Sequence, residues 1–243
     1  MINTIRIRAF RAVDDPEACE KFIYGHRKIL EIYYGIIKIT SDSNDWLKDP
    51  YTIVIIAEDP ETGKIYGGAK VQVFDGSAPL PIQSAVSKYD PLIDTVVWND
   101  FKKGGTCEIC GLWNSKEIAG LGIGSHILSR VGIAISDQLG VKSIFVLCAP
   151  ATVRMGKRNG FVVETELGKD GLFFYPKDDF IATVMRLRDV HDFSLANPQE
   201  LESILLLRNS KTVRLAEKGP KGAFEVDYEL EVHNWVPPKY EDK

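Results

Sequence analysis

A glycine-rich segment that follows a short apolar strand constrains this chain most. Residues 108–125 read E-I-C-G-L-W-N-S-K-E-I-A-G-L-G-I-G-S, with a carboxylate in the strand, then a bend, then Gly120, Gly122 and Gly124 opening a helix. Glycines leave the backbone uncovered where the unpaired N–H groups of a helix start can surround an anion. The pattern therefore predicts a phosphate-binding loop.

The residues after the loop indicate a helix and then a buried strand. Apolar residues recur at every fourth position from Ile123 to Ile135, and Gly140 stands where a helix would end. The next segment, 141–148, reads V-K-S-I-F-V-L-C and is typical of a strand buried on both faces. This order predicts two parallel strands joined by a right-handed helical crossover.

Dinucleotide binding and close helix packing would also account for glycines at a helix start. A dinucleotide-binding loop would need a glycine where Ser125 stands, and an acidic residue at the end of the next strand, which holds Cys148 and Ala149 instead. Both defining spacings fail, which disfavours that class. Alternatively, the glycines only let the helix pack closely, although three glycines within five residues exceed what packing usually requires.

The segment from Ala119 to Gly124 resembles the pyrophosphate loop of the GNAT superfamily of acyl-CoA-dependent N-acyltransferases. The family pattern is Gln or Arg, two residues of any type, Gly, any residue, and Gly or Ala. Gly122 and Gly124 fill both glycine positions, whereas Ala119 replaces the Gln or Arg. The resemblance implies that coenzyme A binds to the strand end and the loop, at Leu112, Trp113, Asn114, Ala119, Gly120, Leu121, Gly122, Ile123, Gly124 and Ser125.

The resemblance also implies the fold class and the reaction. We expect an α/β (α+β) fold with a central mixed, mostly antiparallel, twisted sheet flanked by helices. The implied activity is transfer of an acyl group, most simply acetyl from acetyl-CoA or another acyl-CoA, to the amine of a small molecule or peptide in a ternary complex. No metal is expected, for the reason given with the cysteines below.

Glu108 is the candidate catalytic residue. In the histone-acetyltransferase branch of the family a general-base glutamate lies on this strand, and Glu108 is in the same register relative to the glycine loop. A protonated amine cannot attack a thioester, and a shielded carboxylate has a raised pKa suited to taking its proton. Strand alternation places Glu108, Cys110 and Leu112 on one face and Cys107, Ile109, Gly111 and Trp113 on the other. The alternative role for Glu108 is an ordinary ion pair at the edge of a cleft.

Two other family positions depart from the pattern. Many members have a tyrosine, which protonates the departing thiolate, four residues before a Gly-Phe pair; Gly160 and Phe161 are present, but Gly156 occupies the tyrosine position. Ala149 stands where an asparagine is common. A second hypothesis is therefore a non-catalytic acyl-CoA-binding or regulatory domain.

The resemblance covers residues 1–190, with residues 191–243 as a C-terminal extension. Thr4–Phe10 predicts a first strand, Pro16–Tyr34 a helix capped by Asp15, and Tyr51–Ala57 with Lys64–Phe74 a hairpin. The short run after Phe161, as far as Val163, and the run Phe180–Leu187 supply the closing strands, and the run 168–171 supplies a turn. The extension predicts a helix after Asn197 and a hairpin around K-G-P-K-G, which either covers a sheet edge or contributes to acceptor recognition or a dimer contact.

An insert, residues 75–105, interrupts this pattern and is longer than the minimal fold requires. A comparable insert is found in acyl-homoserine-lactone synthases, a GNAT-like family, whose corresponding strand reads Glu-x-Ser-Arg-Phe. Glu108 matches its first residue, but Gly111 and Leu112 replace Arg and Phe. An autoinducer-synthase-like acyltransferase is thus a distant alternative, and the insert is expected to form a wall of the acceptor pocket.

Composition bounds the class of protein. The net charge of −4 and the pI near 5.7 argue against non-specific nucleic-acid binding. We found no signal peptide or membrane span, so the cytoplasm is the expected location. Arg154, Lys157 and Arg158 form a basic cluster that could meet coenzyme phosphates or simply face solvent.

Cysteines and histidines suggest no metal site. Cys107 and Cys110 have C-x-x-C spacing, but residues three apart on a strand point to opposite faces and cannot both bind one zinc ion. Cys148 could be a nucleophile, although a buried apolar role is more common for free cysteine. His126 could reach the cleft, although a surface or packing role is more common for a histidine beside a binding loop.

Overall fold

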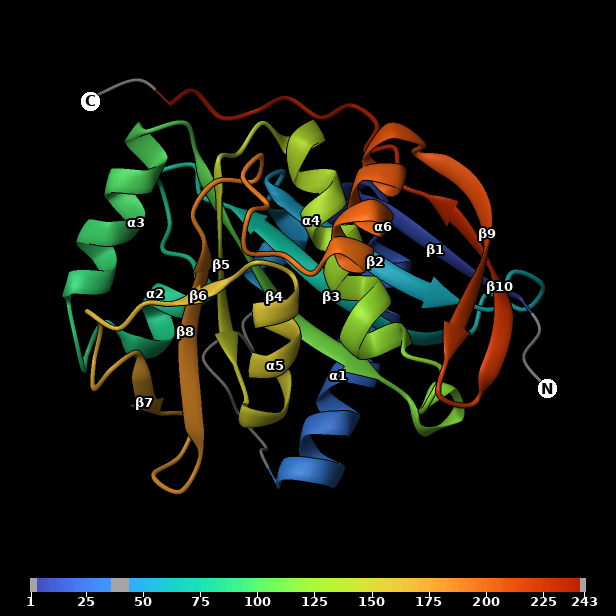
Figure 1. Cartoon of the computed structure of the whole chain (residues 1–243), viewed down its shortest axis with the longest axis horizontal. Coiled ribbons are helices and arrows are strands. Elements are labelled where there is room, and N and C mark those ends of the chain that lie inside the picture. Colours follow the sequence, from blue (N-terminus) through green and yellow to red (C-terminus); the bar gives the residue numbers. More distant parts are fainter. Residues whose placement is uncertain (1–3, 36–43, 241–243) are drawn as a thin grey trace.

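The computed structural model describes residues 4–35 and 44–240, and within these ranges the strands form one ten-stranded mixed sheet. Its order is β6-β8-β5-β4-β3-β2-β1-β10-β9, with β7 paired to β8 (Figure 1). The strands are β1 (Thr4–Arg11), β2 (Thr52–Glu58), β3 (Ile65–Val73), β4 (Thr106–Asn114), β5 (Ser143–Cys148), β6 (Val162–Val163), β7 (Leu172–Phe174), β8 (Ile181–Leu187), β9 (Thr212–Gly219) and β10 (Gly222–Glu229). Only the β4–β5 and β1–β10 pairs are parallel, so the expected mixed, mostly antiparallel sheet is confirmed.

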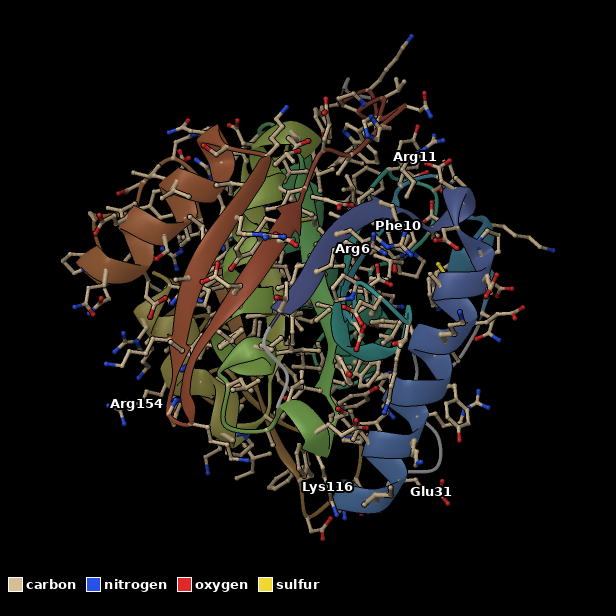
Figure 2. The ribbon with its side chains drawn as sticks, turned by 90° about the vertical axis from the view of Figure 1, so that its right-hand side faces the viewer. Arg6, Phe10, Arg11, Glu31, Lys116 and Arg154 are labelled. Atoms are coloured by element: carbon tan, nitrogen blue, oxygen red, sulfur yellow. The ribbon has the colours of Figure 1, made fainter. Side chains whose placement is uncertain are left out.

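Helices cover both faces of the sheet. The helices are α1 (Pro16–Tyr34), α2 (Pro81–Val86), α3 (Leu92–Lys102), α4 (Leu128–Leu139), α5 (Pro150–Arg158) and α6 (Pro198–Asn209). Seen along the sheet edge, α6 lies on one side of the β9–β10 hairpin and α1 on the other (Figure 2). The main apolar core lies between the sheet and α4, and a second cluster under α1 includes Phe22, Trp46 and Trp113. Burial of these apolar faces is the main force that holds helices against sheet.

Several local predictions are confirmed. Asp15 caps α1 by accepting a hydrogen bond of 3.0 Å from the N–H of Ala18, and Asn197 caps α6 in the same way through Gln199. The hairpin β2–β3 and the strand β5 lie where the apolar runs predict them. No helix among the described residues has the length and apolar character needed to cross a membrane.

The strands β4 and β5 separate soon after they begin. They are paired in parallel at only three positions, the last of which joins Glu108 to Phe145. Beyond this point β4 continues with β3, and β5 continues with β8. A polar cluster holds the paired end together: Ser143 Oγ donates to Asp100 and lies 2.8 Å from Thr106 Oγ1. The separated ends leave room for a cavity inside a continuous sheet.

A β-bulge lies in β4 at the same level. Gly68 pairs with Trp113 and Lys70 with Cys110, so two β4 residues, Gly111 and Leu112, face one residue of β3. Gly111 has φ +61, in the left-handed region that glycine adopts without strain. Because of the extra residue, the side chains beyond it exchange faces.

The predicted alternation along β4 is therefore wrong beyond Gly111. Leu112 packs with the core under α4, and Trp113 packs under α1, where its ring centroid lies 6.0 Å from that of Phe22. Simple alternation predicts the reverse, with Leu112 on the face of Glu108 and Trp113 on the opposite face. Alternation of side chains along a sequence does not show where a strand contains an extra residue, which explains the error.

The insert and the C-terminal segment contain structure that the sequence pattern did not resolve fully. Residues 75–105 form α2 and α3, which pack against β4 and β5 through a separate apolar cluster that includes Ile82, Val86 and Phe101. The C-terminal hairpin β9–β10 forms as expected, and β10 pairs in parallel with β1. This segment thus covers the β1 edge of the sheet. The division at residue 190 stays a prediction, because the sheet continues across it.

Candidate functional site

A cavity of about 250 Å³ lies where β4 and β5 separate. Its walls come from the strands β4, β5 and β8, the helices α1, α2, α4 and α5, and the loop after β7. The lining includes Glu108, Leu112, Ser129, Cys148, Thr152 and Tyr175. Most of the lining is apolar, with a few polar groups among it, which is the usual composition of a small-molecule site.

Glu108 is buried in the wall of this cavity and is 2% exposed. Its Oε2 accepts a hydrogen bond of 2.6 Å from the backbone N–H of Ile82, in the first turn of α2. Burial raises the pKa of Glu108 to about 8, although the Ile82 N–H and the positive charge of Lys70 both favour the ionised form. The carboxyl group therefore changes its protonation state close to neutral pH. The insert supplies this contact, which the sequence did not reveal.

The glycine loop leads from the end of β4 into α4 through a single π-helical turn, Ile123–Ile127. Gly120 and Gly122 have φ values of +87 and +82, which other residues adopt only with strain. At Gly124 a Cβ atom would lie 2.1 Å from Asn114 Oδ1. Backbone conformation thus favours glycine at Gly120 and Gly122, and close packing against Asn114 requires it at Gly124. Close packing therefore explains part of the glycine pattern.

The N–H groups at the start of this helix are available to a ligand. The N–H groups of His126 and Ile127 both donate to the carbonyl of Gly122, at 3.0 and 3.3 Å. The N–H groups before them lie too early in the helix to reach an intrahelical carbonyl. The backbone from Gly122 to Ser125 thus presents donors together with the positive end of the helix dipole. The side chain of Ser125 lies outside the described residues.

The tip of the C-terminal hairpin packs on the glycine loop. The N–H of Lys221 donates to the carbonyl of Gly120 at 3.0 Å. At Gly219 a Cβ atom would lie 2.2 Å from the carbonyl oxygen of Leu121. The last strands of the chain thus help to fix the conformation of a loop about 100 residues earlier, a contact that no local pattern indicates.

Arg158, one of the three residues of the predicted basic cluster, is paired with a carboxylate of this chain. Arg158 donates to the buried carboxylate of Glu200 at 2.9 Å, and Arg130 donates to the same group at 2.7 Å. His126 Nδ1 lies 3.8 Å from Glu200 as well, so it belongs to this cluster on α6. Although burial opposes ionisation of Glu200, the two arginine side chains lower its pKa. The structure thus gives Arg158 and His126 a role in attaching α6.

The position of the missing tyrosine is filled by core packing. At Gly156 a Cβ atom would lie 3.0 Å from Met185 Sδ, so a large side chain does not fit there without moving Met185. Tyr175, from the loop between β7 and β8, lines the same cavity as Glu108. Sequence patterns near α5 give no sign of Tyr175, because its place depends on how β7 pairs with β8.

The cysteines do not form a reactive or metal-binding group. Burial raises the pKa of Cys148 to about 11, so its thiol stays protonated at neutral pH. Cys107 lies in the core under α4. Cys110 lies on the other face of the sheet, where it is paired with Lys70 of the neighbouring strand β3, as the alternation before the bulge predicts. Among residues 4–35 and 44–240, no group of metal-ligating side chains is arranged to hold an ion.

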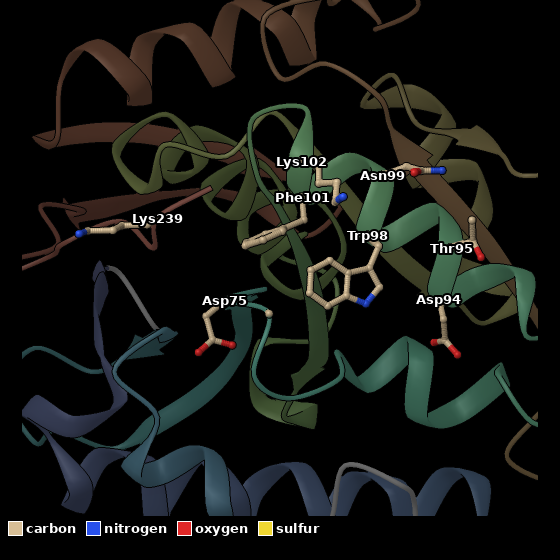
Figure 3. A pocket seen from close by; sticks show the side chains of 9 residues that line it. Asp75, Asp94, Thr95, Trp98, Asn99, Phe101, Lys102 and Lys239 are labelled. Carbon is tan, nitrogen blue, oxygen red and sulfur yellow. The ribbon is translucent and has the colours of Figure 1, made fainter. Parts of the chain in front are cut away.

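Other hollows lie away from Glu108. One of about 470 Å³ is on the insert, where Trp98 lies between Asp75 and Asp94 (Figure 3). Another, of about 780 Å³, lies between α1 and the β2–β3 turn and includes Trp113. Neither of these hollows reaches Glu108 or the gap between β4 and β5. We therefore take the Glu108 cavity as the candidate site.

Comparison with known proteins shows similarity of fold. FeeM, an N-acyl amino acid synthase from uncultured soil microbes, superposes with a TM-score of 0.59 over 79% of this chain and 98% of that chain, at 15% identity. BjaI, a CoA-dependent acyl-homoserine lactone synthase solved with SAM and isopentyl-CoA, gives a TM-score of 0.54 over 82% of this chain and 87% of that chain, at 12% identity. An acyl-CoA N-acyltransferase from Pseudomonas aeruginosa gives 0.50 over 75% of this chain and 98% of that chain, at 14% identity.

No family model and no curated protein matches this chain. The structural matches nevertheless show that it has the fold of the GNAT acyltransferases, with the expected similarity to acyl-homoserine lactone synthases. The fold class inferred from the glycine loop is thereby confirmed.

Proposed function

We propose that this protein is an acyl-CoA-dependent N-acyltransferase. The observation that carries this proposal is the buried carboxyl group of Glu108, beside the gap between β4 and β5 and on the strand that leads to the glycine loop. A carboxyl group whose pKa is raised to about 8 is suited to taking a proton from an ammonium group near neutral pH. The names of the structural neighbours support the same reaction class.

In this proposal the coenzyme lies along β4. The backbone at Leu112, Trp113 and Asn114 holds the pantetheine arm beyond the bulge, where β4 is no longer paired to β5. The pyrophosphate binds to the loop from Ala119 to Ser125, chiefly through the N–H groups from Gly122 to Ser125 at the helix start, because such groups attract anions. The N–H groups of Ala119 and Leu121 already donate to the carbonyls of Lys116 and Ile118. Ala119 offers no side-chain contact to a phosphate, so this binding rests on backbone groups.

The reaction is a direct transfer within a ternary complex. Glu108 accepts a proton from the acceptor ammonium, directly or through a water molecule. The neutral amine nitrogen then attacks the thioester carbonyl carbon, so that a C–N bond forms and the C–S bond breaks. The electron pair of the C–S bond passes to sulfur, and the excess proton on the attacking nitrogen passes to the departing thiolate. An amide and a free thiol result, while Glu108 keeps the proton that it took from the ammonium group. Alignment of the two reactants and polarisation of the carbonyl supply most of the acceleration.

Tyr175 is our candidate for protonating the thiolate. It lines the same cavity as Glu108, whereas the family's tyrosine position holds Gly156. A free thiol has a pKa of about 8.5, so proton donation to sulfur is helpful rather than essential. Replacing Tyr175 with Phe is therefore expected to cause a smaller loss of turnover than removing the Glu108 carboxylate.

The test combines binding with turnover. The protein is titrated with acetyl-CoA and hexanoyl-CoA by calorimetry, and free thiol release is then followed with a panel of amines. We expect Glu108→Gln to keep coenzyme affinity and to lower turnover at neutral pH by roughly 100-fold or more, as loss of a general base does. Glu166→Gln, which changes an exposed glutamate, is the matched control.

Each other outcome has a definite meaning. Binding without thiol release across the panel would favour a non-catalytic acyl-CoA-binding domain. Unchanged turnover in Glu108→Gln would remove Glu108 from the mechanism. Absence of binding to any CoA thioester would overturn the proposal as a whole. The names of the neighbours point to different acceptors, so the acceptor class has to come from the residues of this chain.

A further inference from the structure

Lys70 is a buried cation beside the candidate site. It lies on β3, pairs with Cys110 of β4 and is 4% exposed. Its ammonium group lies 4.3 Å from the ring centroid of Trp46. Among the described residues it makes no hydrogen bond or ion pair, although its charge acts on Glu108 over a longer distance. A buried charge that has an aromatic ring beside it but no hydrogen-bonding or ionic partner is costly, so this ammonium requires a physical reason.

Glu108 does not neutralise Lys70 at close range. Gln72 pairs with Glu108 and Lys70 pairs with Cys110, so the two charged residues are diagonal neighbours on one face of the sheet. Diagonal neighbours are about 7–8 Å apart at their Cα atoms, which leaves space between them for groups of a small molecule. The Glu108 carboxylate is directed to the N–H of Ile82 instead.

The Lys70 side chain reaches space that adjoins the Glu108 cavity. It lines a hollow of about 400 Å³ beside α2, which shares Pro81 with that cavity. It also lines a smaller hollow beside α1, which shares His26 with that cavity. Its Cε lies 3.6 Å from the position of a Cβ on Gly111, at the bulge where β4 turns away from β5. The cation is therefore next to the place where the acceptor amine must arrive.

We propose that the acceptor carries a carboxylate close to its amine, as an α-amino acid does, and that Lys70 binds this carboxylate. This inference rests on the proposed acyltransferase function and gives its acceptor class. The ammonium supplies the positive charge, and Glu108 on the same face receives the proton of the amine. Three aspartates lie on the rim of the larger hollow. Asp49 accepts from Thr52, Asp75 accepts from Ser77, and Asp45 also has an interaction partner of its own.

The test compares acceptors that differ only in the carboxylate. Each L-amino acid is paired with its decarboxylated amine, and KM and kcat are measured by thiol release with the wild-type protein. We expect the KM of the amino acid to be lower by roughly tenfold to 100-fold, which is the effect of one hydrogen bond to a charged group. This comparison needs no variant.

Variants then assign the effect to Lys70. Lys70→Met is expected to raise the KM of the amino acid by the same factor while leaving the KM of the amine unchanged. Lys70→Arg, which keeps the charge, should retain the preference at least in part. Lys88→Met, which changes an exposed lysine, should behave like the wild type. Calorimetric titration with the same pairs measures acceptor binding independently of turnover.

The outcomes separate this inference from the function on which it rests. Equal KM values for amino acid and amine in the wild type, or an equal loss of both in Lys70→Met, would overturn the role of Lys70 while acyl transfer stands. If no acceptor releases thiol, but amino acids bind in calorimetry and Lys70→Met abolishes that binding, the acceptor class is supported and the transfer step fails. Binding of neither class refutes the inference.

Discussion

Replacing Glu108 with Gln tests whether its carboxyl group is buried as the structure describes, without relying on any ligand. Gln is neutral, has nearly the same shape, and can still accept the hydrogen bond from the Ile82 N–H. In the wild type, burial raises the pKa of Glu108 from an ordinary value of 4.5 to about 8. Between these pH values the folded protein holds a proton that the unfolded chain releases.

The sign of the effect follows from proton linkage. The stability that Glu108 contributes is fully present below pH 4.5 and is lost as the pH rises through 8, because the folded state must then hold a buried charge. At about 1.4 kcal/mol for each pKa unit, the loss between pH 5 and pH 9 is roughly 4 kcal/mol. The side chain that replaces Glu108 in the Glu108→Gln variant does not titrate. The free energy of unfolding of the variant minus that of the wild type should therefore increase by this amount between pH 5 and pH 9.

The assay is urea denaturation of both proteins at pH 5, 6, 7, 8 and 9, with Glu166→Gln as an exposed control that should follow the wild type. The difference between variant and wild type removes the contributions of all other groups. Parallel stability curves for wild type and Glu108→Gln over this range would refute the buried carboxyl group, and with it the basis for its catalytic role.

Two further predictions concern the glycine loop and the attachment of α6. Gly122→Ala and Gly63→Ala both place a side chain at a positive φ and should each cost about 1–2 kcal/mol of stability. Only Gly122→Ala should also weaken acetyl-CoA binding in calorimetry; equal affinities would remove the loop from the coenzyme site. Glu200→Ala should lower the free energy of unfolding at pH 7 by about 3 kcal/mol, because it removes the buried carboxylate that two arginine side chains share and leaves Arg130 with only its longer contact to Glu217. Since the pKa of Glu200 is lowered, this loss should shrink as the pH falls below 4.5, whereas exposed Glu202→Ala should show little change at any pH.

Much of the region around the glycine loop could be predicted because its signals are local. Apolar periodicity from Ile123 to Ile135 and the stop at Gly140 describe the helix that forms, although it begins with a π-helical turn. The short-range chemistry of caps and turns identified the start of α1 at Asp15 and the turn of the β9–β10 hairpin. Such signals depend on residues a few positions apart.

The helices of the insert were harder to predict for a physical reason. Pro81–Val86 is a helix of six residues, too short to show a helical period, and its stability depends on packing against β4 and β5. Strand β7 has only three residues and exists because it pairs with β8. Short elements of this kind are decided by tertiary contacts.

The sequence alone determined the order of strand, glycine loop, helix and strand, and the presence of a carboxylate in the first strand, because periodicity and glycine conformation act within a few residues. Tertiary structure decided which groups meet that carboxylate. The bulge at Gly111 exchanges the faces of β4, the insert brings the N–H of Ile82 to Glu108, and strand pairing places Lys70 and Tyr175 beside it. These contacts depend on strand register and on packing between distant segments, which no local pattern of residues encodes.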